Sequence, residues 1–244
     1  MSKPRSEKRK LSDCTTSSIP VCCKVGRLHQ GVFLRGKKIH VISFDVDGTL
    51  VDQKFNEIIW ENDIPALVAE KEGWNFIKAK DFCLSEYEKL GDKDMRWYDI
   101  EYWLKRFNIP IPAIDIFKKR EKSIIVYSDV LPVLAELKKQ GLRIIVITCM
   151  PRIFLKEKIR KFDSHFEKVF STISDFNKVK SPEIYLHVSG VIETSPSDIL
   201  HIGDHHTLDY EFSIEAGYHS LLIERGKKTK EFSISSLKEI FNFL

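Results

Sequence analysis

The sequence lacks the features of membrane-spanning, secreted and disulfide-bonded proteins. No apolar run in its 244 residues reaches the roughly 18 residues needed to cross a bilayer. Its basic N-terminus is not followed by the apolar segment of a secretory signal, which has about 7–15 residues. The five cysteines are odd in number, and their spacing fits neither a disulfide framework nor a zinc site. We therefore expect a reduced, cytoplasmic protein without disulfide bonds or a membrane segment.

The composition is that of an ordinary soluble globular protein. Hydrophobic residues make up 43% of the chain and charged residues 30%, values close to the averages for such proteins. A chain of 244 residues corresponds to one large domain or to a domain that carries an insertion.

The net charge of +4 conceals a strong asymmetry. Residues 1–38 carry ten Lys and Arg against two acidic residues (+8), and the remainder carries 29 basic and 33 acidic residues (−4). Such a basic arm can contact nucleic acid or an anionic membrane. A disordered, solvated tail would have the same composition. So would a segment encoded after an upstream start codon that is not used in nature. No aromatic residue lies between Met1 and Gly31, so we treat residues 1–38 as a tail or a loosely attached segment.

Strands alternate with helices over most of the chain. We expect strands at 39–44, 142–147, 169–173, 199–202 and 219–223. We expect helices at 131–140, 153–161, 182–188 and 209–216, and a short last helix after the capping-box pattern of 236–239. This order predicts an α/β fold with a parallel sheet covered on both faces.

Residues 53–127 interrupt this alternation with a helical segment. Helices are expected before Gly73, before Gly91 and before Pro110, since these residues end helices. All four tryptophans of the chain lie here, and at least one is expected to face a pocket: Trp60, Trp74, Trp97 and Trp103. The core then consists of residues 39–52 and 128–244.

Polar residues follow three of the predicted strands directly. Asp45 and Asp47 end the first strand on the same side, because alternate residues of a strand point the same way. Thr148 and Asp204 end two later strands. Ligands of parallel sheets bind beyond these carboxyl ends. Crowded carboxylates have raised pKa values or hold a cation, so the pattern predicts metal-dependent chemistry.

Four segments together resemble the motifs of the haloacid dehalogenase (HAD) superfamily. They are Asp45-Val46-Asp47-Gly48-Thr49, Thr148, Lys180, and Gly203-Asp204 followed by Asp209. The resemblance extends over about residues 39 to 226, and the order and spacing are those of the phosphatase branch. It implies a doubly wound, Rossmann-like core, and it implies that residues 53–127 form a helical cap over the active site.

The resemblance also implies a role for each motif residue. Asp45 would be the nucleophile that forms an aspartyl-phosphate, and Asp47 would be the general acid and base. Thr148 would donate a hydrogen bond to a phosphoryl oxygen. Lys180 would neutralise the charge of nucleophile and phosphate.

A divalent cation follows from the same resemblance. Hard oxygen ligands favour Mg²⁺, held by Asp45, the main-chain carbonyl of Asp47, Asp204 and Asp209, the last directly or through water. His205 and His206 would suit a softer metal, but they fall in the variable interval between two motif aspartates, where loop or substrate-side roles are more common.

Two motifs depart from the usual pattern of the superfamily. The lysine motif commonly reads Lys-Pro-x-Pro, whereas this chain has Lys178-Val179-Lys180-Ser181-Pro182, so Lys178 is an alternative to Lys180. Cys149 follows Thr148 where a small or amide residue is usual. Arg152, soon after it, either reaches a second anionic group or is a solvated residue at the start of a helix.

The leading hypothesis is a Mg²⁺-dependent hydrolase of a small phosphorylated metabolite. Dehalogenation is disfavoured because that branch lacks the second aspartate, here Asp47. A phosphomutase of the β-phosphoglucomutase type shares all four motifs and stays open. A binding protein that uses the basic arm for nucleic acid or a partner also stays open. Neither the substrate nor the oligomeric state follows from the sequence.

Overall fold

The computed structural model describes residues 38–227 and 230–244. The basic arm expected over residues 1–38, with any contact it makes to nucleic acid, therefore lies outside the described residues except for Lys38. Within the described part of the chain, no helix is long and apolar enough to cross a membrane.

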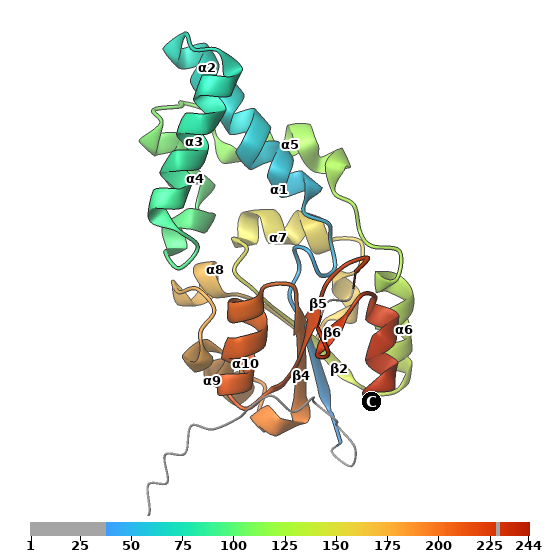
Figure 1. The fold of residues 1–244 in the computed structure, drawn as a ribbon. Helices are drawn as coiled ribbons and strands as arrows, with labels where there is room; N and C mark the ends of the chain where they lie inside the picture. Colours follow the sequence, from blue (N-terminus) through green and yellow to red (C-terminus); the bar gives the residue numbers. More distant parts are fainter. Residues whose placement is uncertain (1–37, 228–229) are drawn as a thin grey trace, which may run out of the picture. The chain divides into compact units, whose positions relative to one another are not determined.

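A parallel sheet of six strands forms the centre of the fold, in the order β3-β2-β1-β4-β5-β6 (Figure 1). The strands are β1 (Val41–Phe44), β2 (Arg143–Thr148), β3 (Lys168–Ser171), β4 (Ile199–Gly203), β5 (His219–Ile223) and β6 (Ser233–Ile234). β1 pairs in parallel with β2 and with β4. The first strand of the chain therefore lies inside the sheet, and its carboxyl end has strand ends on both sides.

Two apolar clusters cover the two faces of the sheet, because alternate strand residues point to opposite sides. Val41 and Ile145 pack with α9 (Pro182–Val191) and the residues beside α10 (Phe212–Glu215). Ile42 and Ile144 pack with α6 (Val130–Lys139) and η7 (Leu237–Asn242) on the other face. The predicted parallel sheet with both faces covered is confirmed.

A helical insertion separates β1 from β2 and lies beyond the carboxyl ends of the strands (Figure 1). Its elements are α1 (Lys54–Ile58), η1 (Ile59–Asp63), α2 (Ile64–Glu72), α3 (Phe76–Leu90), η2 (Met95–Tyr98), α4 (Ile100–Arg106), α5 (Ala113–Arg120) and η3 (Glu121–Ser123). Gly73 ends α2 in the left-handed conformation, with φ of +65°. The helices expected before Gly73, Gly91 and Pro110 are present, and α1 and α5 are additional to them.

Aromatic side chains form the interior of the insertion. Trp103 is 1% exposed, and its ring centroid lies 4.7 Å from that of Tyr87 in an edge-to-face arrangement. Trp60 and Trp97 pack against the same tyrosine. A single aromatic cluster thus holds α3, η1, η2 and α4 together.

Several boundaries predicted from the sequence are wrong. The strand expected at 169–173 ends at Ser171, where α8 (Thr172–Phe176) begins. The strand at 219–223 is not the last one, because the two buried residues Ser233 and Ile234 pair beside it as β6. The helix expected at 209–216 begins earlier, as a π-helical turn η6 (His206–Glu211) that continues into α10. The remaining helices are α7 (Arg152–Ile159), η4 (Asp163–His165) and η5 (Pro196–Asp198). The expected capping box at Ser236 and Glu239 is present.

Candidate active site

The loop after β1 is a tight turn that places Asp45 at the end of the sheet. The backbone N–H of Asp45 donates to Ile202 at 2.9 Å, which extends the pairing of β1 with β4. Gly48 then adopts a φ of +69°, and a Cβ there would collide with the carboxylate of Asp204. Only glycine permits this turn at such a close approach, as expected for this motif.

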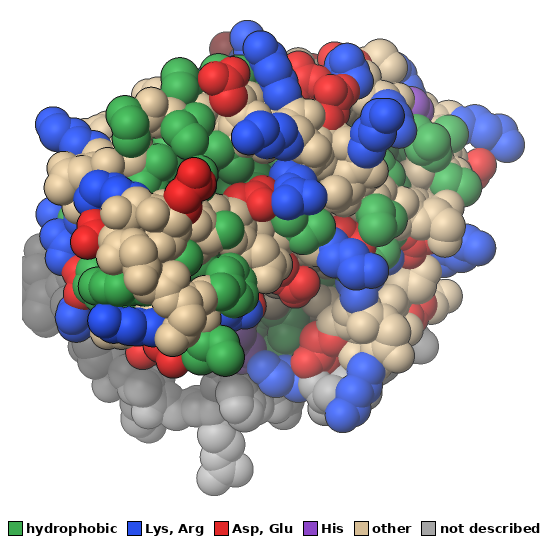
Figure 2. Space-filling view, turned by 90° about the horizontal axis from the view of Figure 1, so that it is seen from above, with side chains coloured by type: hydrophobic (Ala, Val, Ile, Leu, Met, Phe, Trp, Pro, Cys, Tyr) green, Lys and Arg blue, Asp and Glu red, His purple; other side chains and the backbone are tan. Residues whose placement is uncertain are grey.

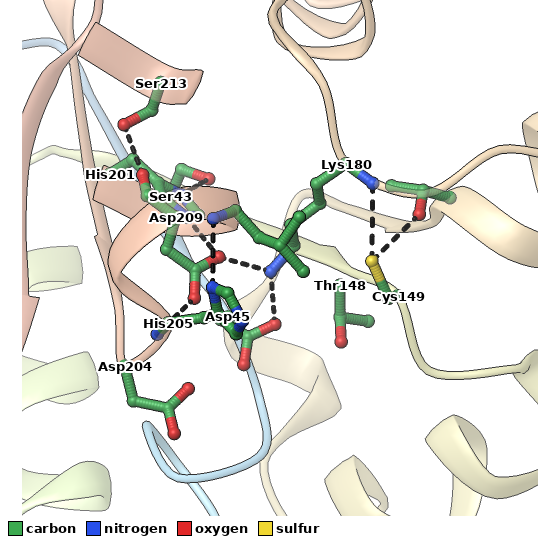
Figure 3. A network of polar contacts seen from close by, with 12 residues as sticks. Ser43, Asp45, Thr148, Cys149, Lys180, His201, Asp204, His205, Asp209 and Ser213 are labelled. Atoms are coloured by element: carbon green, nitrogen blue, oxygen red, sulfur yellow. Dashed lines mark hydrogen bonds and ion pairs between the residues drawn. The ribbon is translucent and has the colours of Figure 1, made fainter. Parts of the chain in front are cut away.

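Three carboxylates converge at this edge of the sheet (Figure 3). Asp45 follows β1, Asp204 follows β4, and Asp209 lies on η6. One ligand oxygen from each lies within 4.8 Å of the others. Gly203 makes this possible, because a Cβ at that position would overlap Asp209. Of the four aspartates expected here, three form the group.

Lys180 joins two of these carboxylates. Its Nζ lies 2.5 Å from Oδ1 of Asp45 and 2.5 Å from Oδ1 of Asp209, and the residue is 2% exposed. Ser181 caps α9 by accepting a hydrogen bond from Ile184 N–H, and this fixes Lys180 at the start of the helix. Lys178 is exposed and pairs with Glu183 at 3.4 Å instead. The structure therefore brings Lys180, and not Lys178, to the carboxylates.

The buried charges shift one another's pKa values. Burial raises the pKa of Asp45 to about 7, against the attraction of Lys180. Burial also acts to raise the pKa of Asp209, but Lys180 and His201 hold it well below its usual range. Burial acts to lower the pKa of Lys180, and the carboxylates of Asp209 and Asp45 outweigh this effect and raise it. Asp209 is therefore the stronger acid of the two carboxyl groups beside Lys180, and both carboxylates favour the charged form of the lysine.

His201 is a second partner of Asp209 that sequence reasoning missed. Its Nε2 lies 3.2 Å from Oδ1 of Asp209 and 3.0 Å from the Tyr185 hydroxyl, and its Nδ1 lies 2.9 Å from the Ser43 hydroxyl. Burial lowers the pKa of His201, so the ring is neutral and serves to orient Asp209. The only signal in the sequence was a polar residue inside an apolar strand.

The second motif lies beside the same group. Thr148 ends β2, is 2% exposed, and accepts a hydrogen bond from Met150 N–H at 3.2 Å. Cys149 is buried, and its Sγ accepts from the backbone N–H of Lys180 at 3.4 Å. Burial raises the pKa of the Cys149 thiol. Arg152 pairs with Asp175 at 2.6 Å, so its charge is already matched by a protein carboxylate.

The side chain of Asp47 is not a member of the three-carboxylate group and has a partner of its own. Its Oδ1 lies 2.5 Å from Nζ of Lys158, which also donates to Oδ1 of Asn56 at 2.7 Å. Lys158 comes from α7 and its side chain is 0% exposed. Sequence reasoning missed this lysine because it belongs to none of the four motifs and lies among other lysines of an ordinary amphipathic helix.

Two further contacts connect the insertion to the core at the site. Gln53 Nε2 donates to Oδ2 of Asp204 at 2.7 Å. Nε2 of His205 lies 3.1 Å from Oδ2 of Asp92, while its Nδ1 accepts from Leu208 N–H. His206 lies 3.4 Å from Glu211. Neither histidine belongs to the carboxylate group found among the described residues.

A cavity of about 530 Å³ opens above these groups. Asp45, Asp47, Thr148, Lys180, Asp204 and Asp209 line its floor together with Cys149. Its walls come from the insertion and include Trp60 and Trp97. The expectation that a tryptophan faces a pocket is confirmed for these two. The carboxylate group at the floor is built from oxygen ligands alone, the donor set that suits Mg²⁺.

The chain matches the family model of haloacid dehalogenase-like hydrolases over residues 39–217. It is 24% identical over 136 residues to the GMP/IMP nucleotidase YrfG of Escherichia coli (strain K12). That match covers 55% of this chain and 60% of the nucleotidase, so the chain spans less than two thirds of this relative's length.

Solved structures share the fold at low sequence identity. A HAD phosphatase from Thermococcus onnurineus superposes with a TM-score of 0.76 at 21% identity, covering 84% of this chain and 97% of its own. A predicted phosphoglycolate phosphatase from Haemophilus somnus 129pt has a TM-score of 0.59 at 18% identity, and the match covers 84% of this chain and 97% of that one. The putative HAD-hydrolase YfnB from Bacillus subtilis, bound to magnesium, has a TM-score of 0.59 at 18% identity, and the match covers 84% of this chain and 98% of that one.

Proposed function

This chain belongs to the haloacid dehalogenase-like hydrolase family, and we propose that it is a phosphatase that hydrolyses small phosphomonoesters with Mg²⁺ through an aspartyl-phosphate on Asp45. The observation that carries this proposal is the pairing of Lys180 with both Asp45 and Asp209 at the floor of the cavity. A buried cation beside a nucleophilic carboxylate stabilises the negative charge of the phosphoryl oxygens in the transition state of phosphoryl transfer.

Mg²⁺ would be held by Asp45, the main-chain carbonyl of Asp47, Asp204 and Asp209, the last directly or through water. Bound there, it would neutralise the carboxylates and the phosphate oxygens, so that an anionic ester can approach. The oxygen donor set and its 4.8 Å spacing support this assignment.

In the first step an oxygen of Asp45 attacks phosphorus and the ester P–O bond breaks. Lys180 holds Oδ1 of Asp45, which leaves Oδ2 for the new bond. Asp47 gives its proton to the departing alcohol oxygen. In the second step Asp47 takes a proton from water, the water oxygen attacks phosphorus, and the bond to Asp45 breaks, which releases inorganic phosphate. Thr148 and the N–H groups after it hold the phosphoryl oxygens.

The insertion, residues 53–127, serves as a cap over the core of residues 39–52 and 128–244. The Gln53–Asp204 contact and the insertion residues that line the cavity support this division. A cap of this kind limits the access of water and chooses the substrate. Nucleoside monophosphates, named for the YrfG relative, and phosphoglycolate, named for a structural neighbour, are the first candidates to test.

The experiment measures phosphate release from para-nitrophenyl phosphate and a panel of metabolite phosphates, with Mg²⁺ or with EDTA. Wild type is compared with Asp45→Asn and with Asp81→Asn, an exposed aspartate of α3. We expect release that needs Mg²⁺, is lost in Asp45→Asn and is kept in Asp81→Asn. Conversion of a sugar phosphate into its isomer without release would support a phosphomutase instead.

A further inference from the structure

The wall of the cavity is acidic and aromatic and carries no positive charge. Residues 53–127 contain thirteen Lys and Arg, yet none of them lines the cavity. Most of these cations are exposed, and Figure 2, which looks down onto the insertion, shows such side chains over its outer surface. Lys180 is the one cationic side chain among the described residues that line the cavity, and Asp45 and Asp209 already surround it.

This charge distribution disfavours a substrate with a second anionic group. A carboxylate or second phosphate on the organic part would face Glu57, Glu61 and Glu88, which line the wall. Among the residues that line this partly dehydrated cavity it would meet no lysine or arginine except Lys180, which two carboxylates already surround, so little would compensate for its lost hydration. Phosphorylated acids and bisphosphates are therefore poor matches for this wall.

The same side chains are suited to a flat, N–H-bearing group. Trp60 and Trp97 line the cavity and are only partly buried, so their rings have surface available for stacking. Glu57 and Glu88 are exposed, and their side chains form no hydrogen bond or ion pair with another described residue, whereas Glu61 is paired with Lys80 at 2.9 Å. Free carboxylates accept hydrogen bonds from N–H groups.

The cavity also has room for a large organic part. Its volume of about 530 Å³ lies within the range of small-molecule sites, roughly 300–1,000 Å³. A two-carbon acid would leave most of this space unfilled and both tryptophan faces uncovered. A nucleoside, whose sugar is uncharged, would fill far more of it.

We propose that the site selects phosphomonoesters whose organic part is a flat, N–H-bearing ring system without a second negative charge, as in purine nucleoside monophosphates. The stacking surface is Trp60 and Trp97, and Glu88 and Glu57 accept from the ring. This proposal rests on the proposed phosphatase function, because it assigns the leaving group of that same reaction.

Its test compares kcat/KM for inosine monophosphate, glycerol phosphate and phosphoglycolate, with para-nitrophenyl phosphate as the general phosphatase control. We expect wild type to prefer the nucleotide over phosphoglycolate by at least about tenfold. Trp97→Leu should lower kcat/KM for the nucleotide several-fold more than kcat/KM for glycerol phosphate. Glu88→Lys should raise the phosphoglycolate-to-nucleotide ratio several-fold, while Glu70→Lys, an exposed residue of α2 outside the cavity, should not.

A binding measurement keeps this proposal separate from the proposed function. Both ligands are titrated into the Asp45→Asn variant in the presence of Mg²⁺ while its tryptophan fluorescence is followed. Inosine monophosphate should quench the fluorescence at a lower concentration than phosphoglycolate needs to change it. Turnover of para-nitrophenyl phosphate with a preference for phosphoglycolate, or equal effects of Glu88→Lys and Glu70→Lys, would overturn the substrate assignment alone. Nucleotide binding without turnover of any ester would instead overturn the phosphatase function and leave the binding assignment standing.

Discussion

The ammonium group of Lys158 lies 2.5 Å from the carboxylate of Asp47, at a position where the lysine side chain is fully buried. Burial lowers the pKa of Lys158, and the Asp47 carboxylate opposes this effect. Its second acceptor, Asn56, belongs to α1, the first helix of the insertion. A buried ammonium needs such partners because its hydration is lost. Lys158 therefore fixes the side chain of Asp47 relative to the base of the insertion.

The first prediction concerns this positioning. Lys158→Met removes the partner that orients Asp47, so protonation of the leaving alcohol should suffer. General acid catalysis contributes roughly 10²–10⁴-fold, and a loss of about tenfold or more is expected for an alkyl phosphate. Para-nitrophenyl phosphate needs little protonation of its leaving group and should lose much less. Steady-state kinetics on both esters measure this difference.

Lys156→Met is the matched control, because Lys156 is an exposed lysine of the same helix. Circular dichroism should show that both variants are folded. An equal loss on the two esters for Lys158→Met would mean that the residue supports the fold and does not position Asp47.

The second prediction separates the two candidate lysines of the third motif. Lys180→Met leaves the carboxylates of Asp45 and Asp209 close together and buried without the cation between them. We expect phosphate release to fall by about 10² or more, in line with the loss of a charged group that stabilises a transition state. Lys178→Met should behave like wild type, because the Lys178 side chain forms its one ion pair among the described residues with the exposed Glu183. Comparable losses in the two variants would contradict the assignment.

The third prediction concerns the cation at Asp45, Asp204 and Asp209. If Mg²⁺ binds only the folded state, it should raise the unfolding free energy by about 2.7 kcal/mol when free Mg²⁺ is present at about 100 times its dissociation constant. Thermal unfolding should therefore shift upward with added Mg²⁺ and return with EDTA. Asp204→Asn should lose most of this shift, because Asp204 is the member of the group that does not contact Lys180. A full shift in Asp204→Asn would place the cation elsewhere.

Patterns local in the sequence predicted the arrangement of the floor. Strand ends at Asp45, Thr148 and Asp204 were visible as apolar runs that stop at a polar residue, and parallel strands bring such ends together. The sheet and the helical insertion followed from the same periodicities. β6 was missed because a strand of two residues, Ser233 and Ile234, has no periodicity to detect.

Contacts between distant segments could not be predicted in this way. Lys158 and Asn56 are 102 positions apart. Nothing in the sequence near either residue indicates that they form a hydrogen bond with each other. His201 had the same difficulty, since its partners Ser43 and Tyr185 come from other elements. The lysine motif of this chain has a changed spacing, so its alignment with the usual motif permits either Lys178 or Lys180. The structure decides between them, because the start of α9 places Lys180 beside the carboxylates.

The last prediction concerns a buried carboxylate, Asp129, that is not a member of the three-carboxylate group. Oδ2 of Asp129 accepts hydrogen bonds from Arg225 at 2.7 Å, from the Ser236 hydroxyl at 2.7 Å and from Leu237 N–H at 2.8 Å. Burial acts to raise the pKa of Asp129, but these donors outweigh it and hold the pKa below its usual value. Arg225 also donates to the carbonyl of Thr49 in the first motif. The pair therefore ties the C-terminal helix η7 to the loop that carries Asp45.

A carboxylate with a lowered folded-state pKa stabilises the fold above its unfolded-state pKa, roughly 3.9. This contribution is lost as the pH falls through the folded-state value. Asp129→Asn should thus lower the unfolding free energy by about 1–3 kcal/mol at neutral pH, and the difference from wild type should shrink as the pH falls below about 4. Urea unfolding followed by circular dichroism from pH 7 to pH 3 measures it, with Asp81→Asn as the control. A difference that stays constant or grows toward low pH would show that the Asp129 charge does not stabilise the fold.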